Sequence, residues 1–348
     1  MSIVTIKLAD VKSQTNERPE KCPHCEGETF QRWGQVRKTI RDQKVKEVSI
    51  YRYRCCRCHK TFRHYPEGVD RKGQSQRLRK VVAIMWMLGL SYRSLEIVLD
   101  FFGVKLGRMS GWRDVQERAG QLFRQQKGKR VRVLGLDVGY VRGMGETQPV
   151  MVAVDMGDGL PITIGYVDEK DPQAVKRFLQ PLVQQLGVSV VVTDDLATYR
   201  TVTGQLNLEH QVCQFHLRRW VGRTLRELRQ SVPEEWLGVV EEIQEIIDEL
   251  PIHGERRLFQ LWKQIPESRR GRKDEPYSVL DQLRYLIIRL AENWRRYRVF
   301  DWDQEVPWTN NLTEQTIGRM KMRSRTVRGY KSKRGMLNAL MLAGMGLC

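Results

Sequence analysis

Residues 131–217 contain short apolar runs separated by turns, which is the pattern of strands. The runs "RVLGLDVGYVRG" and "PVMVAVDMGDGLPITIGYVDEK" predict three consecutive strands, the last two joined by a turn rich in Gly and Asp. An amphipathic helix that begins with Pro172 comes next. It is followed by a buried strand in "VSVVVTDDLATY", a short helix, and a further strand close to Cys213. The order is therefore three strands, a helix, a strand, a helix and a strand.

This order predicts an α/β core of the RNase H-like type. After residue 217 the alternation ends, and residues 218–305 predict helices only. In one of them apolar residues recur at helical spacing, namely Leu280, Leu283, Leu286, Ile287, Leu290 and Trp294. Residues 306–348 return to helix. We therefore expect a core built from residues 132–217 and 306–348, interrupted by an all-helical insertion.

Three helices are predicted upstream, between residues 75 and 123. The stretch "RLRKVVAIMWMLGL" has an apolar stripe, and the next helix follows Ser91, a suitable N-cap. With "GRMSGWRDVQERAGQLF" after them, they outline a helix-turn-helix DNA-binding domain. Its third helix would present Arg108, Ser110 and Arg113. The alternative is an ordinary three-helix core in which Trp86 and Phe101 pack.

Seven cysteines occur in the chain, and five of them lie between residues 22 and 58. Two Cys-x2-Cys pairs can present four thiolates to one tetrahedral Zn²⁺, formed by Cys22, Cys25, Cys55 and Cys58. The strand-like residues between the pairs predict a zinc ribbon over 21–70, with a structural zinc. Cys56, His24 and His59 are spare donors that we expect not to bind. The chain is thus predicted to be multidomain, with an N-terminal arm (1–20) and a basic linker (124–131).

The formal net charge of +19 predicts a polyanionic partner, because Lys and Arg gain affinity by releasing counterions from phosphates. A membrane surface is the other candidate, but the longest apolar run, "GMLNALMLAGMGLC", is too short to cross a bilayer. The N-terminus also lacks the pattern of a signal peptide. We therefore expect a cytoplasmic, nucleoid-associated protein that acts on nucleic acid.

Acidic residues follow two of the predicted strands. Asp137 lies in an otherwise apolar strand, where an acid is costly without a partner. Asp194 and Asp195 end the fourth strand, and Asp195 suits a cap of the next helix, which leaves Asp194 as a metal ligand. Asp155 also ends a strand, but the turn "DMGDG" that it begins accounts for an acid at this position. The sequence therefore offers carboxylates for a divalent metal site.

Glu314 is the single carboxylate in a basic C-terminal segment that begins at Val306. It could close a capping box with Asn311, since Asn-x-x-Glu is the spacing of such a cap. It could equally be a third metal ligand beside a nucleic-acid phosphate. The residues alone do not choose between the two roles.

The motifs "GLDVG", "VVTDDLATY", "CQFHL" and "TNNLTEQTIGRMKMRSRTVRGYKS" resemble those of bacterial insertion-sequence DDE transposases. The similarity covers roughly residues 130–345 and is greater to the Mutator-type branch, which has an all-helical insertion before the final Glu. It implies that Asp137, Asp194 and Glu314 are the catalytic acids and bind two Mg²⁺ ions, which Mn²⁺ could replace. It also implies cleavage and strand transfer at terminal inverted repeats, by a dimer or larger assembly on double-stranded DNA.

The basic run after Glu314 would hold DNA phosphates, through Arg319, Lys321, Arg323, Arg325, Arg328 and Lys331. Cys213 and His216 match a Cys-x2-His signature of the same branch, and two donors alone do not make a zinc site. We expect a structural or DNA-contacting role for them. Trp302 and Trp308 could stack on an unpaired base or pack in a core.

Two other functions stay open: a domesticated protein that binds DNA without cutting it, and an RNase H-like nuclease or junction resolvase.

Overall fold

The structure is a computed structural model that describes residues 8, 10–15, 17–126, 128–267, 277–327 and 329–346. The chain divides into two compact units. One consists of Met1–Arg124, Gly143–Gly145 and Arg319–Cys348, and the other of Gln125–Arg142 and Glu146–Gly318. Each unit is described below by itself. In the described ranges, every helix is too short or too polar to cross a bilayer.

The first unit begins with a three-stranded antiparallel sheet, formed by β1 (Phe30–Thr39), β2 (Glu47–Cys55) and β3 (Thr61–His64) in that order. The register of β1 against β2 shifts at Gly34, whose φ of 133° favours a residue without a side chain. A small apolar cluster lies on one side of the sheet, built from Ile40, Val48, Ile50 and Val69. Strands β1 and β2 therefore form the hairpin that connects the two cysteine pairs.

Three helices follow in the same unit: α1 (Gln76–Met87), α2 (Tyr92–Phe101) and α3 (Arg108–Gln126). Ser91 caps α2 as predicted, because its hydroxyl accepts a hydrogen bond from the Ser94 N–H at 3.0 Å. Trp86 is buried between the helices, but Phe101 is 85% exposed and is not part of the core. Since α3 continues to Gln126, the predicted linker begins with three helical residues.

The second unit contains a five-stranded mixed sheet with the order β6-β5-β4-β7-β8. Its strands are β4 (Val133–Gly143), β5 (Glu146–Asp155), β6 (Pro161–Tyr166), β7 (Val190–Thr193) and β8 (Glu209–Val212). β7 is parallel to both β4 and β8, whereas β5 and β6 are antiparallel. The helices α4 (Pro172–Leu186) and α5 (Ala197–Gln205) connect β6 to β7 and β7 to β8. The predicted sequence of strands and helices is confirmed, and it makes β4 and β7 neighbours.

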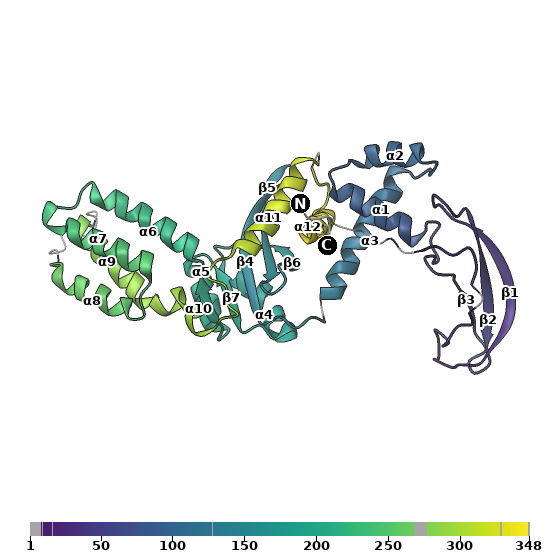
Figure 1. Cartoon of the computed structure of the whole chain (residues 1–348), viewed down its shortest axis with the longest axis horizontal. Helices are drawn as coiled ribbons and strands as arrows, with labels where there is room; N and C mark the ends of the chain where they lie inside the picture. The colour runs from purple at the N-terminus through teal and green to yellow at the C-terminus, as the bar shows by residue number, and fades with distance from the viewer. Residues whose placement is uncertain are drawn as a thin grey trace. The chain divides into compact units, whose positions relative to one another are not determined.

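A group of helices follows β8 in the second unit (green in Figure 1). It contains α6 (Gln214–Arg229), α7 (Leu237–Glu249), α8 (Gly254–Gln264), α9 (Val279–Glu292) and the short α10 (Val299–Trp302). The apolar faces of α6, α7, α8 and α9 share one core, in which Leu283, Leu286, Ile287 and Leu290 of α9 are buried as the spacing predicts. Two helices end the described chain, α11 (Asn311–Arg325) and α12 (Lys333–Met345).

Candidate active site and zinc centre

Four cysteines come together beside the first sheet. The Sγ atoms of Cys22 and Cys58 are 3.8 Å apart, and those of Cys25 and Cys55 are 3.6 Å apart. A tetrahedron with Zn–S bonds of about 2.3 Å has edges of about 3.8 Å, so these separations suit one zinc ion. All four ligand atoms lie within 4.8 Å of one another. This cluster could therefore bind a structural zinc.

The two cysteine pairs have the same local backbone. The residue after each pair, Glu26 or His59, has φ of 59°, and its N–H bonds to the carbonyl of the first cysteine at 2.9 Å and 3.0 Å respectively. A backbone N–H also approaches the sulfur of the first cysteine in each turn, at 3.4 Å from Cys22 and 3.3 Å from Cys55. Such turns hold the two thiols of each pair on the same side. The spare cysteine, Cys56, is exposed.

The candidate active site lies in the second unit, where β4 and β7 run side by side. Gly135 pairs with Val192, and continuing this parallel register by two residues brings Asp194 beside Asp137. Asp137 accepts the Val138 N–H at 2.7 Å through Oδ1. Asp194 is the first residue after β7 and is half-buried. The sheet therefore brings together two acids that are 57 residues apart in the sequence.

Glu314 reaches the same site because the start of α11 packs tightly against β4. The side-chain amide of Asn310 donates to the Leu136 carbonyl at 2.8 Å, and the Asn310 N–H approaches Cys213 Sγ at 3.3 Å. A Cβ on Gly135 would lie 2.2 Å from Thr313 Oγ1, so only glycine permits this approach. Glu314 follows in the first turn of the helix.

The capping box suggested for Glu314 does not form. The N–H groups of Thr313 and Glu314 both bond to the Asn310 carbonyl at 3.1 Å, so Asn310 occupies the cap position. Asn311 is inside the helix, and Glu314 lies one residue beyond the position that a capping box requires. Its Oε1 atom is buried without a hydrogen-bond partner among the described residues. Its closest charged neighbour is His216, with 3.7 Å between Oε1 and Nδ1.

Burial and crowding of the acids shift their proton affinities. Burial raises the pKa of Asp137 to about 6, and the carboxylates of Glu169 and Glu314 act in the same direction. Burial also raises the pKa of Asp194 to about 7, with further contributions from Asp137 and Glu169. Buried carboxylates that repel one another are stabilised by a divalent cation. Asp194 Oδ1 is, like Glu314 Oε1, a buried oxygen without a hydrogen-bond partner in the described chain.

The three carboxylates are not within reach of one ion. Among the described residues, the groups of three or more donors whose ligand atoms all lie within 4.8 Å of one another are the four cysteines and the set Cys213, His216 and Glu314. In a site for two ions, each ion needs only some of the acids. Asp137, Asp194 and Glu314 supply oxygen donors of the kind that Mg²⁺ prefers.

Glu169 is a fourth acid at this site, and no pattern in the sequence indicates it. It lies in the loop between β6 and α4, where Tyr140 and Tyr199 orient it by donating hydrogen bonds to its two oxygens at 3.1 Å and 3.5 Å. It contributes to the raised pKa of both Asp137 and Asp194. A polar loop position of this kind follows no periodic pattern, so only the folded chain identifies it.

Cys213 and His216 lie beside Glu314, at the start of α6. The contact with Cys213 raises the pKa of His216. Burial acts to raise the pKa of Cys213, but hydrogen bonds, mainly those with His216, outweigh it, so the pKa of Cys213 is lowered. When protonated, the His216 imidazole partly balances the charge of Asp137 and Asp194. With Glu314, the two residues form the second set of donors in the described chain that could hold a metal ion, which the spacing Cys-x2-His alone does not indicate.

Asp195 does not cap α5, contrary to the sequence-based interpretation. The cap position is Leu196, without a side-chain hydrogen bond. The buried carboxylate of Asp195 instead accepts from Arg200 at 3.1 Å and from Arg289 of α9 at 2.8 Å. It therefore ties the helical group to the end of β7 next to Asp194. Asp155 binds the Gly157 N–H of its own turn at 2.8 Å, as expected for a turn residue.

The predicted DNA-binding residues of the first unit have mixed surroundings. Arg108 and Arg113 are exposed on α3, although Arg108 forms an ion pair with Glu96, and Ser110 is half-buried. On α11 and beyond it, Arg325 and Lys331 are exposed, Lys321 is half-buried, and Arg319 donates to the Gly344 carbonyl at 3.0 Å. Arg328 lies outside the described residues.

The prediction that Arg323 contacts DNA is corrected by the structure. Its guanidinium is buried 4.1 Å from the ring centre of Trp86 and donates to the Leu90 carbonyl at 3.1 Å. A side chain held in this way cannot reach a phosphate. It contributes instead to the packing between helices of the first unit. Trp302 and Trp308, in contrast, are each about half exposed (53% and 54%), so neither ring is fully packed in a core.

The raised pKa of Asp137 makes metal-free stability depend on pH. Because the folded-state pKa is about 6 and the ordinary value is 3.8, the contribution to stability is complete below pH 3.8 and is lost as pH rises through 6. We expect Asp137→Asn to raise the free energy of unfolding at pH 8 in magnesium-free buffer, by up to about 3 kcal/mol, and to have little effect at pH 4. Urea unfolding at both pH values measures this, with the exposed Glu146→Gln as control. An equal effect of Asp137→Asn at both pH values would contradict the assignment.

Comparison with known proteins assigns the family. Residues 163–338 match the model of the Transposase IS66 family, and this range includes Asp194 and Glu314 but not Asp137. A chain from Methanobrevibacter smithii, described as "Insertion element ISM1 uncharacterized 48.3 kDa protein", is 22% identical over 333 residues, covering 92% of this chain and 80% of that one. The protein is therefore a transposase of the insertion-sequence type. More specifically, the chain belongs to the IS66 transposase family.

Among solved structures, the "Drosophila P element transposase strand transfer complex" is similar with a TM-score of 0.30 and 9% sequence identity. The similarity covers 76% of this chain and 78% of that one. A TM-score this low does not establish a common fold.

Proposed function

We propose that this chain is a DDE transposase that binds the terminal inverted repeats of its element and performs magnesium-dependent DNA cleavage and strand transfer. The observation that carries the proposal is the convergence of Asp137, Asp194 and Glu314, two of which have a buried oxygen without a hydrogen-bond partner in the described chain. In this proposal the mixed sheet is an RNase H-like core and the helices after β8 are its insertion. The Mutator-type relationship remains a prediction.

Each acid has a distinct support. Asp137 lies in β4 and Asp194 directly follows β7, the parallel neighbour of β4, so regular structure positions both carboxylates. Glu314 comes from α11, whose position depends on the Asn310 bond to β4 and on Gly135. When bound to these carboxylates, two magnesium ions would activate the attacking oxygen and stabilise the leaving oxygen at the phosphodiester. The three acids serve as ligands, so no covalent enzyme–DNA intermediate is expected.

The protein's own residues also control charge in the site. Glu169 raises the proton affinity of the two aspartates, whereas His216 lowers it. Magnesium has to displace bound protons below about pH 7, since carboxylates bind it only when ionised. We therefore propose Glu169 as an acid that makes the site more negative when the metals are present.

DNA contacts would come mainly from the basic residues of the first unit. We propose that the exposed Arg108 and Arg113 of α3, with Ser110, read the ends in a helix-turn-helix manner. The group Arg319, Lys321, Arg325 and Lys331 would bind phosphates without sequence preference. Two ends have to be held at once, so a dimer or a larger assembly on double-stranded DNA is part of the proposal, as is a nucleoid-associated location in the cytoplasm.

The experiment that tests this function is strand transfer on DNA with the native ends of the element. We expect wild-type protein to join the ends to a target plasmid with Mg²⁺ and not without it, and Asp137→Asn to be inactive. If wild type binds the ends but neither cuts nor joins them, the non-catalytic DNA-binding function is favoured. If it cuts branched DNA and never joins ends, the nuclease or resolvase function replaces our proposal.

A further inference from the structure

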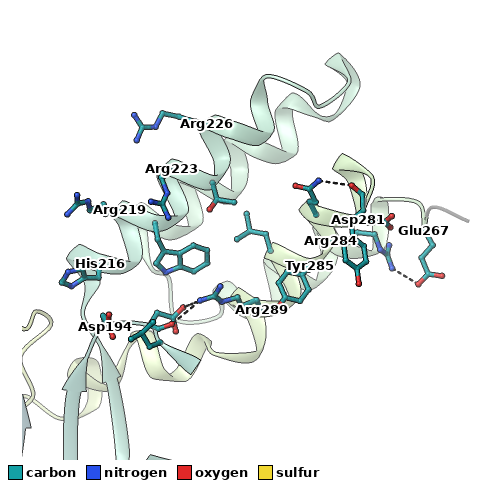
Figure 2. A pocket seen from close by; sticks show the side chains of 17 residues that line it. Asp194, His216, Arg219, Arg223, Arg226, Glu267, Asp281, Arg284, Tyr285 and Arg289 are labelled. Atoms are coloured by element: carbon teal, nitrogen blue, oxygen red, sulfur yellow. Dashed lines mark hydrogen bonds and ion pairs between the residues drawn. The ribbon is translucent and has the colours of Figure 1, made fainter. Parts of the chain in front are cut away.

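A large cavity opens next to the candidate active site, between α6 and α9 of the second unit (Figure 2). Its volume is about 1680 Å³, and Asp194 and His216 are among the residues that line it. Pockets for small molecules measure about 300–1,000 Å³, so the cavity is larger than a metabolite requires. It therefore suits an extended ligand that continues away from the acids.

One wall of the cavity carries a row of basic side chains on α6. His216, Arg219, Arg223 and Arg226 follow at intervals of three, four and three residues, which places them along one stripe of the helix. Figure 2 shows them in succession from the acid end outwards. Arg219 and Arg223 are exposed, and within the described ranges neither forms an ion pair with an acid. Arg226 donates to the Gly222 carbonyl of its own helix at 3.1 Å.

Aromatic side chains line the cavity from both helices. Tyr285 of α9 is 71% exposed and faces this space. Trp220 lines the cavity from α6, with the guanidinium of Arg289 4.3 Å from its ring centre, and its indole nitrogen is buried without a hydrogen-bond partner in the described chain. Aromatic faces beside a row of cations are the elements that single-stranded nucleic acid requires: phosphates meet the cations and unpaired bases stack on the rings.

Acidic side chains also line the cavity, and they already accept hydrogen bonds from other residues of the protein. Asp281 accepts from Ser278 at 2.8 Å, Glu267 accepts from Arg284 at 3.2 Å, and Asp195 accepts from Arg200 and Arg289. Asp281 and Glu267 lie far along the cavity from Asp194 (Figure 2). The end nearest the candidate active site is therefore the cationic one, apart from the acids that would bind metal.

We propose that the cavity between α6 and α9 binds an unpaired DNA strand that leaves the active site, with its phosphates on Arg219 and Arg223 and a base against Tyr285 or Trp220. A paired base keeps its faces inside the stack, so a duplex would leave these rings without a partner. The inference rests on the proposed transposase function for the source of the strand. The single-strand contact itself can be measured without catalysis.

The test compares a native element end that is blunt with the same end carrying a single-stranded tail, in magnesium-free buffer. We expect wild-type protein to bind the tailed DNA more tightly, and Arg219→Ala/Arg223→Ala to lose this difference. The slope of log affinity against log salt should decrease by about 1.4 in magnitude, since each single-strand phosphate contact contributes about 0.7. The control is Arg256→Ala/Lys263→Ala, which removes two exposed cations of α8 outside the cavity and should change neither quantity.

Photo-crosslinking locates the contact. Tails that contain 5-iodouracil should form adducts in the peptides with Trp220 or Tyr285, and Tyr285→Ala should reduce the adduct yield at that position. Equal affinity for blunt and tailed ends, equal losses in both double variants, or adducts confined to the first unit would overturn the proposal. Tail contacts in a protein that never joins ends would leave the cavity assignment intact and remove the transposase function. Strand transfer without tail contacts would leave the transposase function intact and remove the cavity assignment.

Discussion

Glu314→Gln should abolish strand transfer while leaving the binding of element ends unchanged. The substitution keeps the shape of the side chain and a hydrogen-bonding oxygen, but it removes the negative charge that a divalent metal requires. A metal ligand contributes several kcal/mol to the transition state, so we expect joining to fall by at least about a thousandfold. The structure supports this over a capping role, because Asn310 and not Asn311 provides the helix cap.

Joining by Glu314→Gln is measured at equal occupancy of the ends, which a gel-shift titration establishes first. Glu227→Gln, an exposed acid of α6, is the matched control and should join like wild type. If Glu314→Gln joins as fast as wild type, Glu314 is not a metal ligand. If the variant loses joining because it is unfolded, its circular dichroism spectrum will differ from that of wild type.

Loss of the four-cysteine site should unfold the ribbon and weaken binding to the element ends. Structural zinc sites contribute about 10–16 kcal/mol of apparent binding free energy, which is more than a small three-stranded sheet gains from its core. The cluster Ile40, Val48, Ile50 and Val69 is small, so we expect the sheet to depend on a bound metal. We expect Cys25→Ser/Cys58→Ser to lose its zinc and to bind the ends at least tenfold more weakly.

Cys56→Ser is the matched control for this experiment. Cys56 lies between two of the ligands in the sequence but is exposed and outside the cluster. Metal analysis should find one zinc per chain in wild type and in this control. Zinc loss from Cys56→Ser equal to that from the double variant would show that the ligand set is different.

The strands and their acids were predictable because short-range patterns determine them. Runs such as "VSVVV" are apolar on both faces, so they indicate buried strands, and an acid directly after such a run is conspicuous. The adjacency of Asp137 and Asp194 then follows from the order of the strands. The cysteine pairs were equally clear, since the chemistry of a zinc site fixes their spacing.

Residues whose role depends on distant partners were not predictable. Asp195 has the spacing of a cap, but its carboxylate is bound to Arg289, 94 residues away. Arg323 has the composition of a DNA-binding run, but the packing against Trp86 buries it. The stripe from His216 to Arg226 is visible in the sequence as a spacing, but nothing in the spacing says that it faces a cavity. Glu169 has no pattern at all.

The central claim is that Asp137, Asp194 and Glu314 together bind divalent metal. The most direct test is the anomalous signal of Mn²⁺ in crystals of the protein soaked at pH 8, where the aspartates are ionised. We predict two manganese sites, one between Asp137 and Asp194 and a second that includes Glu314. Absence of signal beside the two aspartates, or a single ion held by Cys213, His216 and Glu314 alone, would contradict it.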